Sequence, residues 1–112
     1  KIKSDKIMDN LEQSLIAIQK LREEIPDSVN AYLNYTNKVK AGGHLNEKQK
    51  ALITVALSLQ SKCEMCISMN TSLAIESGAT KDEILEASML SVAMGGGSIM
   101  MYMKFVLAEF ED

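Results

Sequence analysis

The residues most able to do chemistry in this chain are its two cysteines, Cys63 and Cys66, which lie three positions apart. Two thiols at this spacing can close a small disulfide ring or share a metal ion. If a helix begins at the pair, its unpaired N–H groups favour thiolate over thiol. One thiolate could then attack a peroxide or a partner disulfide, and the neighbouring thiol could resolve the product as an intramolecular disulfide. The pair therefore predicts a redox centre.

Two other uses of the cysteine pair compete with redox chemistry. A closed zinc site needs four ligands, but the chain has no second cysteine pair and a single histidine, His44, beside two glycines. Zinc would need ligands from another subunit, so we expect neither a metal nor another cofactor. Cysteine is also a common small buried hydrophobe. Two of them at this spacing and at a helix start favour chemistry over packing.

Composition restricts the class of protein. With 112 residues, 46% of them apolar, the chain is expected to form one domain over residues 1–112. A net charge of −3 with scattered lysines argues against nucleic acid as a partner. No apolar run approaches the roughly 20 residues that span a bilayer, so we expect no membrane association. The first residues lack the apolar core of a secretion signal, and we expect a cytoplasmic protein.

Proline, the glycines and the seam at the cysteine pair divide the chain into six segments in which apolar residues recur at helical spacing. No segment shows convincing strand-like alternation, so the sequence predicts an all-α fold of about six helices. The first segment is a stripe from Met8 to Leu21 ended by Pro26, and the second is a stripe from Val29 to Val39 closed by a left-handed cap at Gly42-Gly43. The third runs from Leu52 to Leu59 behind a capping box at Asn46 and Gln49, and the fourth runs from near Cys63 to Gly78. The fifth starts with a capping box at Thr80 and Glu83 and ends at Gly95-Gly96-Gly97, and the sixth runs from Ile99 to Phe110.

Two of these segments are apolar on more faces than one protomer can cover. Between Ala51 and Leu59 only Thr54 and Ser58 are polar, and the last segment carries apolar side chains on several faces. A helix that is apolar nearly all round must be buried. We therefore expect a homo-oligomer, in which other copies of the chain cover the excess surface.

From about Gly43 to its C-terminus the chain resembles the carboxymuconolactone decarboxylase superfamily, in its alkyl hydroperoxidase D-like branch. The resemblance is carried by an ordered set of short motifs rather than by the bare cysteine spacing. They are Leu45-Asn46-Glu47-Lys48 before an apolar segment, Cys63-Glu64-Met65-Cys66-Ile67, Ala74 with Gly78-Ala79-Thr80, Glu83-Ile84, and Met94-Gly95-Gly96.

The resemblance implies an all-helical protomer, usually assembled into trimers or hexamers. It also implies a thiol peroxidase of the peroxiredoxin type, or a disulfide centre. Cys66 would attack the peroxide or disulfide substrate, Cys63 would resolve the product, and a thiol reductant would restore the pair. In that branch a histidine four residues after the second cysteine and a glutamate twelve residues before the first relay a proton. This chain has Asn70 and Ala51 there instead.

The two replacements affect the expected function. Asparagine can hydrogen-bond but does not titrate near neutral pH, and alanine has no proton to move. Glu47, His44 and Glu76 are alternative bases. We therefore expect a thiol–disulfide oxidoreductase that is at most a weak antioxidant peroxidase, with Asn70 as a supporting residue. The alternative is a non-enzymatic oligomeric redox sensor or binding scaffold, and lactone decarboxylation is a weaker third.

Overall fold

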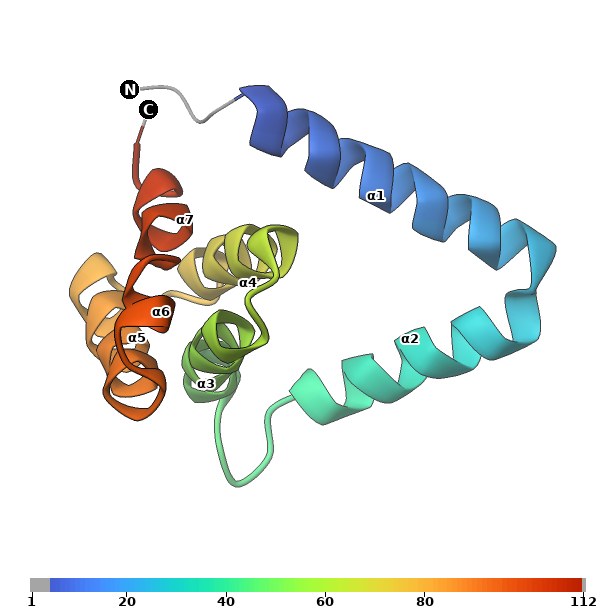
Figure 1. The fold of residues 1–112 in the computed structure, drawn as a ribbon. Coiled ribbons are helices and arrows are strands. Elements are labelled where there is room, and N and C mark those ends of the chain that lie inside the picture. Colours follow the sequence, from blue (N-terminus) through green and yellow to red (C-terminus); the bar gives the residue numbers. More distant parts are fainter. Residues whose placement is uncertain (1–4, 112) are drawn as a thin grey trace.

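The computed structural model describes residues 5–111, with side chains described for residues 11–111. Within residues 5–111 every regular element is a helix. The all-α prediction is confirmed. Helices α3 to α7 form one packed body, and α1 and α2 form a long hairpin that projects from it (Figure 1). The helices are α1 (Asp5–Glu24), α2 (Pro26–Lys40), α3 (Glu47–Ser61), α4 (Glu64–Glu76), α5 (Lys81–Gly95), α6 (Gly97–Met100) and α7 (Met103–Ala108).

Both predicted capping boxes are present. The backbone N–H of Gln49 donates to the side chain of Asn46 at 2.8 Å, and the Asn46 N–H donates back to Gln49 at 2.9 Å. At the start of α5 the Glu83 N–H donates to the Thr80 hydroxyl at 3.1 Å, and the Thr80 N–H donates to the Glu83 carboxylate at 2.9 Å. Each box pairs N–H groups at the start of its helix that have no partner within the helix. The starts of α3 and α5 are therefore set by local sequence.

The predicted left-handed glycine cap at the end of α2 is wrong. Neither Gly42 nor Gly43 has a positive φ, and the helix ends at Ala41 in an extended conformation. The Lys50 ammonium donates instead to the carbonyls of Val39 and Ala41, at 2.8 and 2.7 Å. A cation supplied by α3 satisfies the last carbonyls of α2, so no left-handed residue is needed there.

The last predicted helix is two helices. Gly96 reverses the chain with φ 81°, α6 ends at Met100, and α7 begins only at Met103. Between the two helices the Tyr102 N–H bonds to Ile99 and the Phe105 N–H bonds to Tyr102, each spanning three residues rather than four. Such bonds tighten the chain into a turn. Apolar residues lie on both sides of this turn, so the hydrophobic pattern carries no sign of it.

The hydrophobic core lies between α3, α4, α5 and the two short C-terminal helices. The α1–α2 hairpin contributes little to it, since α2 has no buried residue and the predicted stripe residues Leu15, Ile18 and Leu21 of α1 are exposed. Met8, the first predicted member of that stripe, lies outside the residues with described side chains. The largest fully buried apolar side chains are Val55, Leu59, Ile67, Ile84, Ile99 and Val106.

An ion pair between Lys48 and Glu83, with a distance of 2.9 Å, joins α3 to α5 and predicts a pH effect on stability. The Thr80 N–H and then the Lys48 ammonium lower the pKa of Glu83 from its ordinary 4.5. A carboxyl group whose pKa is lower in the folded than in the unfolded state stabilises the fold at pH values above its unfolded pKa. This contribution disappears as the pH falls through the folded pKa. We expect Glu83→Gln to lower the free energy of unfolding at neutral pH and to make little difference well below pH 4.5.

Urea unfolding of the wild type and of Glu83→Gln, at neutral pH and at a pH well below 4.5, measures this effect. Glu86→Gln, on the same helix but outside the capping box and the ion pair, is the matched control. A loss in Glu83→Gln that persists unchanged in acid would contradict the electrostatic explanation.

Candidate functional site

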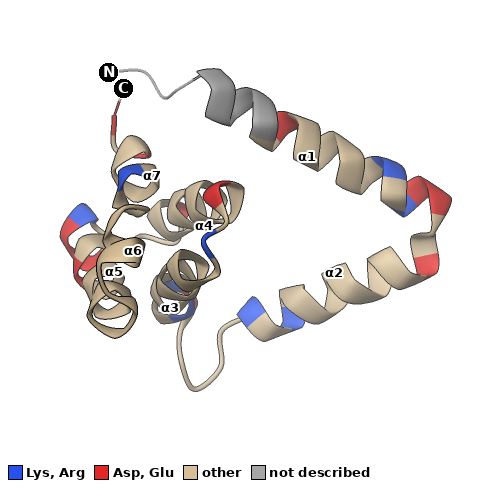
Figure 2. Ribbon diagram, viewed as in Figure 1, with Lys and Arg blue, Asp and Glu red and all other residues tan. Residues whose placement is uncertain are grey.

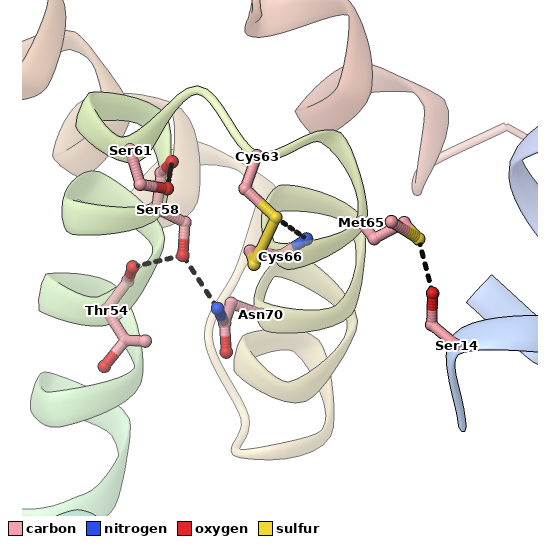
Figure 3. The surroundings of a disulfide bond; sticks show 8 residues. All are labelled: Ser14, Thr54, Ser58, Ser61, Cys63, Met65, Cys66 and Asn70. Carbon is pink, nitrogen blue, oxygen red and sulfur yellow. Dashed lines mark hydrogen bonds between the residues drawn. A yellow bond between two sulfur atoms is a disulfide. The ribbon is translucent and has the colours of Figure 1, made fainter. Parts of the chain in front are cut away.

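Cys63 and Cys66 form a disulfide at the start of α4, with their Cα atoms 5.2 Å apart (Figure 3). This separation is within the usual range for disulfides, about 4.4–6.8 Å. Cys63 is the N-cap residue of α4, and the backbone N–H of Cys66 donates to the Cys63 sulfur at 3.2 Å. Both cysteines are partly exposed. The predicted placement of the pair at a helix start is therefore confirmed.

The chain reaches this position through a sharp reversal after α3. Lys62 caps α3 in the left-handed conformation, with φ 56°, and is the one non-glycine residue with positive φ in the part of the chain described. Cys63 then returns to an extended conformation and α4 starts at Glu64. The cysteine pair thus sits on a tight link between two packed helices.

The hairpin also contacts the cysteine segment. The hydroxyl of Ser14 on α1 donates to the sulfur of Met65, which lies between the two cysteines, at 2.9 Å. On the other side of the segment, Lys62 and Glu64 share a shallow hollow with Tyr102 and Lys104. Lys62 and Glu64 are the sequence neighbours of Cys63, beside the positive end of α4.

Asn70 lies one turn after Cys66 on the side of α4 that faces α3. Its amide nitrogen donates to the Ser58 hydroxyl at 2.7 Å, and Ser58 donates in turn to the Thr54 carbonyl at 2.8 Å (Figure 3). Ser58 is only 6% exposed. Sequence reasoning did not place Ser58 at the site, although its polarity in an apolar segment was a signal. The packing of α3 on α4 brings it to Asn70.

Ala51 and Asn70, which stand at the two predicted relay positions, line one cavity of about 220 Å³. The cavity lies between the end of α2, the first half of α3 and the second half of α4. Of the three alternative bases, Glu47 lines this cavity, whereas His44 and Glu76 do not. The structure therefore brings the two relay positions together and places one carboxylate beside them.

Among the described residues, no group of three or more histidine, cysteine or acidic side chains is arranged to hold a metal ion. Within the same residues, no helix has the length and apolarity needed to cross a membrane.

The chain is thus all-helical, with a cysteine pair at the start of α4. Residues 26–109 match the model of the carboxymuconolactone decarboxylase family, so the chain belongs to that family. The match begins before Gly43, where the recognisable motifs start. The cysteine pair is consistent with the alkyl hydroperoxidase D-like branch.

Two similar proteins match about three quarters of this chain. An uncharacterized protein of Cupriavidus necator is 33% identical over 86 residues, which are 77% of this chain and 76% of that protein. Uncharacterized protein 4 in the cox locus of Paracoccus denitrificans is 30% identical over 82 residues, or 73% and 74% of the two chains.

Two solved structures share the fold. A carboxymuconolactone decarboxylase family protein of Legionella pneumophila, solved in its apo form, superimposes with a TM-score of 0.90 at 30% identity over 96% of both chains. A family member from Thermotoga maritima, described as a candidate for the antioxidative response, gives a TM-score of 0.79 at 20% identity over 90% of this chain and 87% of its own. The second likeness concerns the fold alone.

Proposed function

We propose that this protein is a thiol–disulfide oxidoreductase with weak thiol-dependent peroxidase activity. The observation that carries the proposal is the Cys63–Cys66 disulfide at the N-terminus of α4, with both residues partly exposed. In a reducing compartment such as the cytoplasm, a thiol reductant would return the pair to the dithiol and allow a further cycle.

The reaction has two steps in this proposal. The Cys66 thiolate attacks one oxygen of a hydroperoxide, so that an S–O bond forms, the O–O bond breaks, and the leaving alkoxide or hydroxide takes up a proton. The Cys63 thiol then attacks the resulting sulfenic acid, so that the disulfide forms and water leaves. A dithiol reductant reverses the disulfide by exchange and is itself oxidised.

Proton transfer is the weak part of this site. Asn70 hydrogen-bonds to Ser58 and does not titrate, and Ala51 carries no proton. Without a general acid–base pair, thiol activation would depend on the helix N-terminus and on the adjacent Lys62. The presence of Asn70 and Ala51 at the relay positions favours a second candidate function. This is a non-enzymatic redox sensor, in which the disulfide forms but does not turn over rapidly.

A thiol titration separates the two functions. Free thiols are counted before and after stoichiometric hydrogen peroxide, and turnover is then measured with a general dithiol reductant. Rapid disulfide formation with turnover supports the enzyme, and disulfide formation without turnover supports the sensor. Thiols that remain unreactive would refute both.

We also propose that the protein assembles as a homo-oligomer, most simply a trimer or hexamer. Along α3 and α5 an open apolar groove is lined by Leu52, Ile53, Leu57 and Leu90, and the side chains of Leu57 and Leu90 are 63% and 69% exposed. The projecting hairpin carries a second uncovered apolar surface. Because contiguous exposed apolar surfaces mark interaction sites, a second copy of the chain is the natural cover for both surfaces.

Disrupting the groove should disrupt the assembly. We expect the double variant Leu57→Glu with Leu90→Glu to sediment as a smaller species than the wild type at micromolar concentration, because burying unpaired carboxylates is costly. Ser98→Glu, at an exposed position outside the groove, should leave the assembly intact. A wild-type protein that sediments as a folded monomer would refute the proposed assembly.

A further inference from the structure

The cavity between α2, α3 and α4 has an unusual distribution of hydrogen-bonding groups. Two of its lining hydroxyls have already donated their protons to backbone carbonyls, Thr54 to Lys50 at 2.8 Å and Ser77 to Leu73 at 2.9 Å. A hydroxyl has one proton, so both can only accept a further hydrogen bond. These two groups therefore offer the cavity acceptors and no donors.

Asn70 contributes a third acceptor, because its amide orientation is fixed. The single hydroxyl proton of Ser58 is donated to the Thr54 carbonyl, so Ser58 can only accept from Asn70. The amide nitrogen must therefore face Ser58, as the 2.7 Å bond requires, and the amide oxygen points away from Ser58 and from the cysteines (Figure 3). Asn70 also lines the cavity, together with Leu73 and Ser77.

The charged groups of the lining are mainly cationic. Lys40 and Lys50 both line the cavity, and Figure 2 shows basic residues, in blue, at the C-terminal end of α2. The Lys50 ammonium is held in place by the carbonyls of Val39 and Ala41, which use two of its three protons. Glu47 is the single acidic residue of the lining, so the two lysines outnumber it.

The cavity therefore combines oxygen acceptors, two cations and a short apolar wall formed by Ala51 and Leu73. At about 220 Å³ it is smaller than the sites of drug-sized ligands, which are about 300–1,000 Å³. We propose that it binds a short hydroxycarboxylate. The hydroxyl group donates to the Asn70 oxygen, the alkyl chain lies against Ala51 and Leu73, and the carboxylate pairs with Lys40 and the remaining proton of Lys50.

The cavity is lined by the two relay positions, Ala51 and Asn70, and is present while the disulfide is closed. Binding is therefore measured on the oxidised protein, where no thiol can react, by ligand-observed saturation-transfer NMR. The probe is 3-hydroxybutyrate, compared with butyrate, which lacks the donor, and 1,3-butanediol, which lacks the carboxylate. We expect each truncated probe to bind about five- to tenfold more weakly, the usual effect of losing one hydrogen-bonding or charged partner.

Three variants and one control variant locate the binding. Ala51→Leu should abolish it by filling the cavity, whereas Ala31→Leu, at an exposed position of α2, should leave it unchanged. Lys40→Gln should weaken 3-hydroxybutyrate and butyrate alike and leave the diol unaffected. Ser58→Ala frees the Asn70 amide to turn, so it should reduce the preference for 3-hydroxybutyrate over butyrate.

Several results would overturn the proposal. Equal affinity for the three probes would remove the argument from complementary groups, and unchanged binding in folded Ala51→Leu would place the ligand elsewhere. Tighter binding of 3-aminobutyrate than of 3-hydroxybutyrate would show that Glu47 and the acceptors select an ammonium group instead. No binding of any probe would refute the site while leaving the thiol chemistry untouched.

Discussion

Cys66→Ser should abolish the rapid reaction of this protein with hydrogen peroxide. In the proposed mechanism Cys66 supplies the attacking sulfur, and a serine hydroxyl at that position is far too weakly acidic to replace a thiolate. Cys63→Ser should instead keep the first step and stop at a sulfenic acid, or at a mixed disulfide with an added thiol. Mass spectrometry after alkylation, with and without prior reduction, distinguishes the two outcomes.

The geometry of the pair also allows the opposite assignment of the attacking and resolving cysteines. Cys63, not Cys66, is the N-cap of α4, and its sulfur already accepts the Cys66 N–H at 3.2 Å. Such a bond would favour thiolate at Cys63. If Cys63→Ser loses peroxide reactivity and Cys66→Ser keeps it, the roles are reversed. Ser61→Ala, which removes a nearby hydroxyl bonded to the Ser58 carbonyl, is the control for local disturbance of the α3 terminus.

The helices that sequence reasoning placed best are those with local start signals. Asn46 with Gln49 and Thr80 with Glu83 fix the starts of α3 and α5, because both partners of each cap are within four residues of one another. The prediction of a glycine cap at the end of α2 was wrong for the opposite reason. Its cap is the ammonium of Lys50, which belongs to the next helix, so no local pattern could reveal it.

The same distinction applies to the candidate site. The cysteine pair and its position at a helix start were predictable, since both depend on adjacent residues. The contact of Asn70 with Ser58 and the shared cavity of Ala51 and Asn70 depend on how α3 packs against α4. A single sequence does not reveal how two helices pack against each other. The relay positions could therefore be identified only through the family resemblance.

That shared cavity makes the double variant Ala51→Glu with Asn70→His a direct test of what limits the chemistry. The two side chains would meet in an existing space, and the Ser58 oxygen that accepts from Asn70 could accept from an imidazole N–H. Positioned acid–base groups contribute about 10²–10⁴-fold in rate, and a graft without its supporting contacts should recover about tenfold. We therefore expect the double variant to react about tenfold faster with peroxide than the wild type.

The single variants should behave differently from the pair. Ala51→Glu places a second carboxylate one turn from Glu47, on the same side of α3, so repulsion should raise the pKa of the new group and lower stability. A histidine opposite it would relieve that repulsion when protonated. The second-order rate of thiol loss across neutral pH is measured for the wild type, both single variants and the double variant, with oligomeric state checked for each. The matched control is Ala31→Glu with Asn70→His, which adds the same charge away from the cavity. If the double variant does not exceed this control, the missing relay is not what limits the native protein, and the sensor function becomes the better account of its cysteine pair.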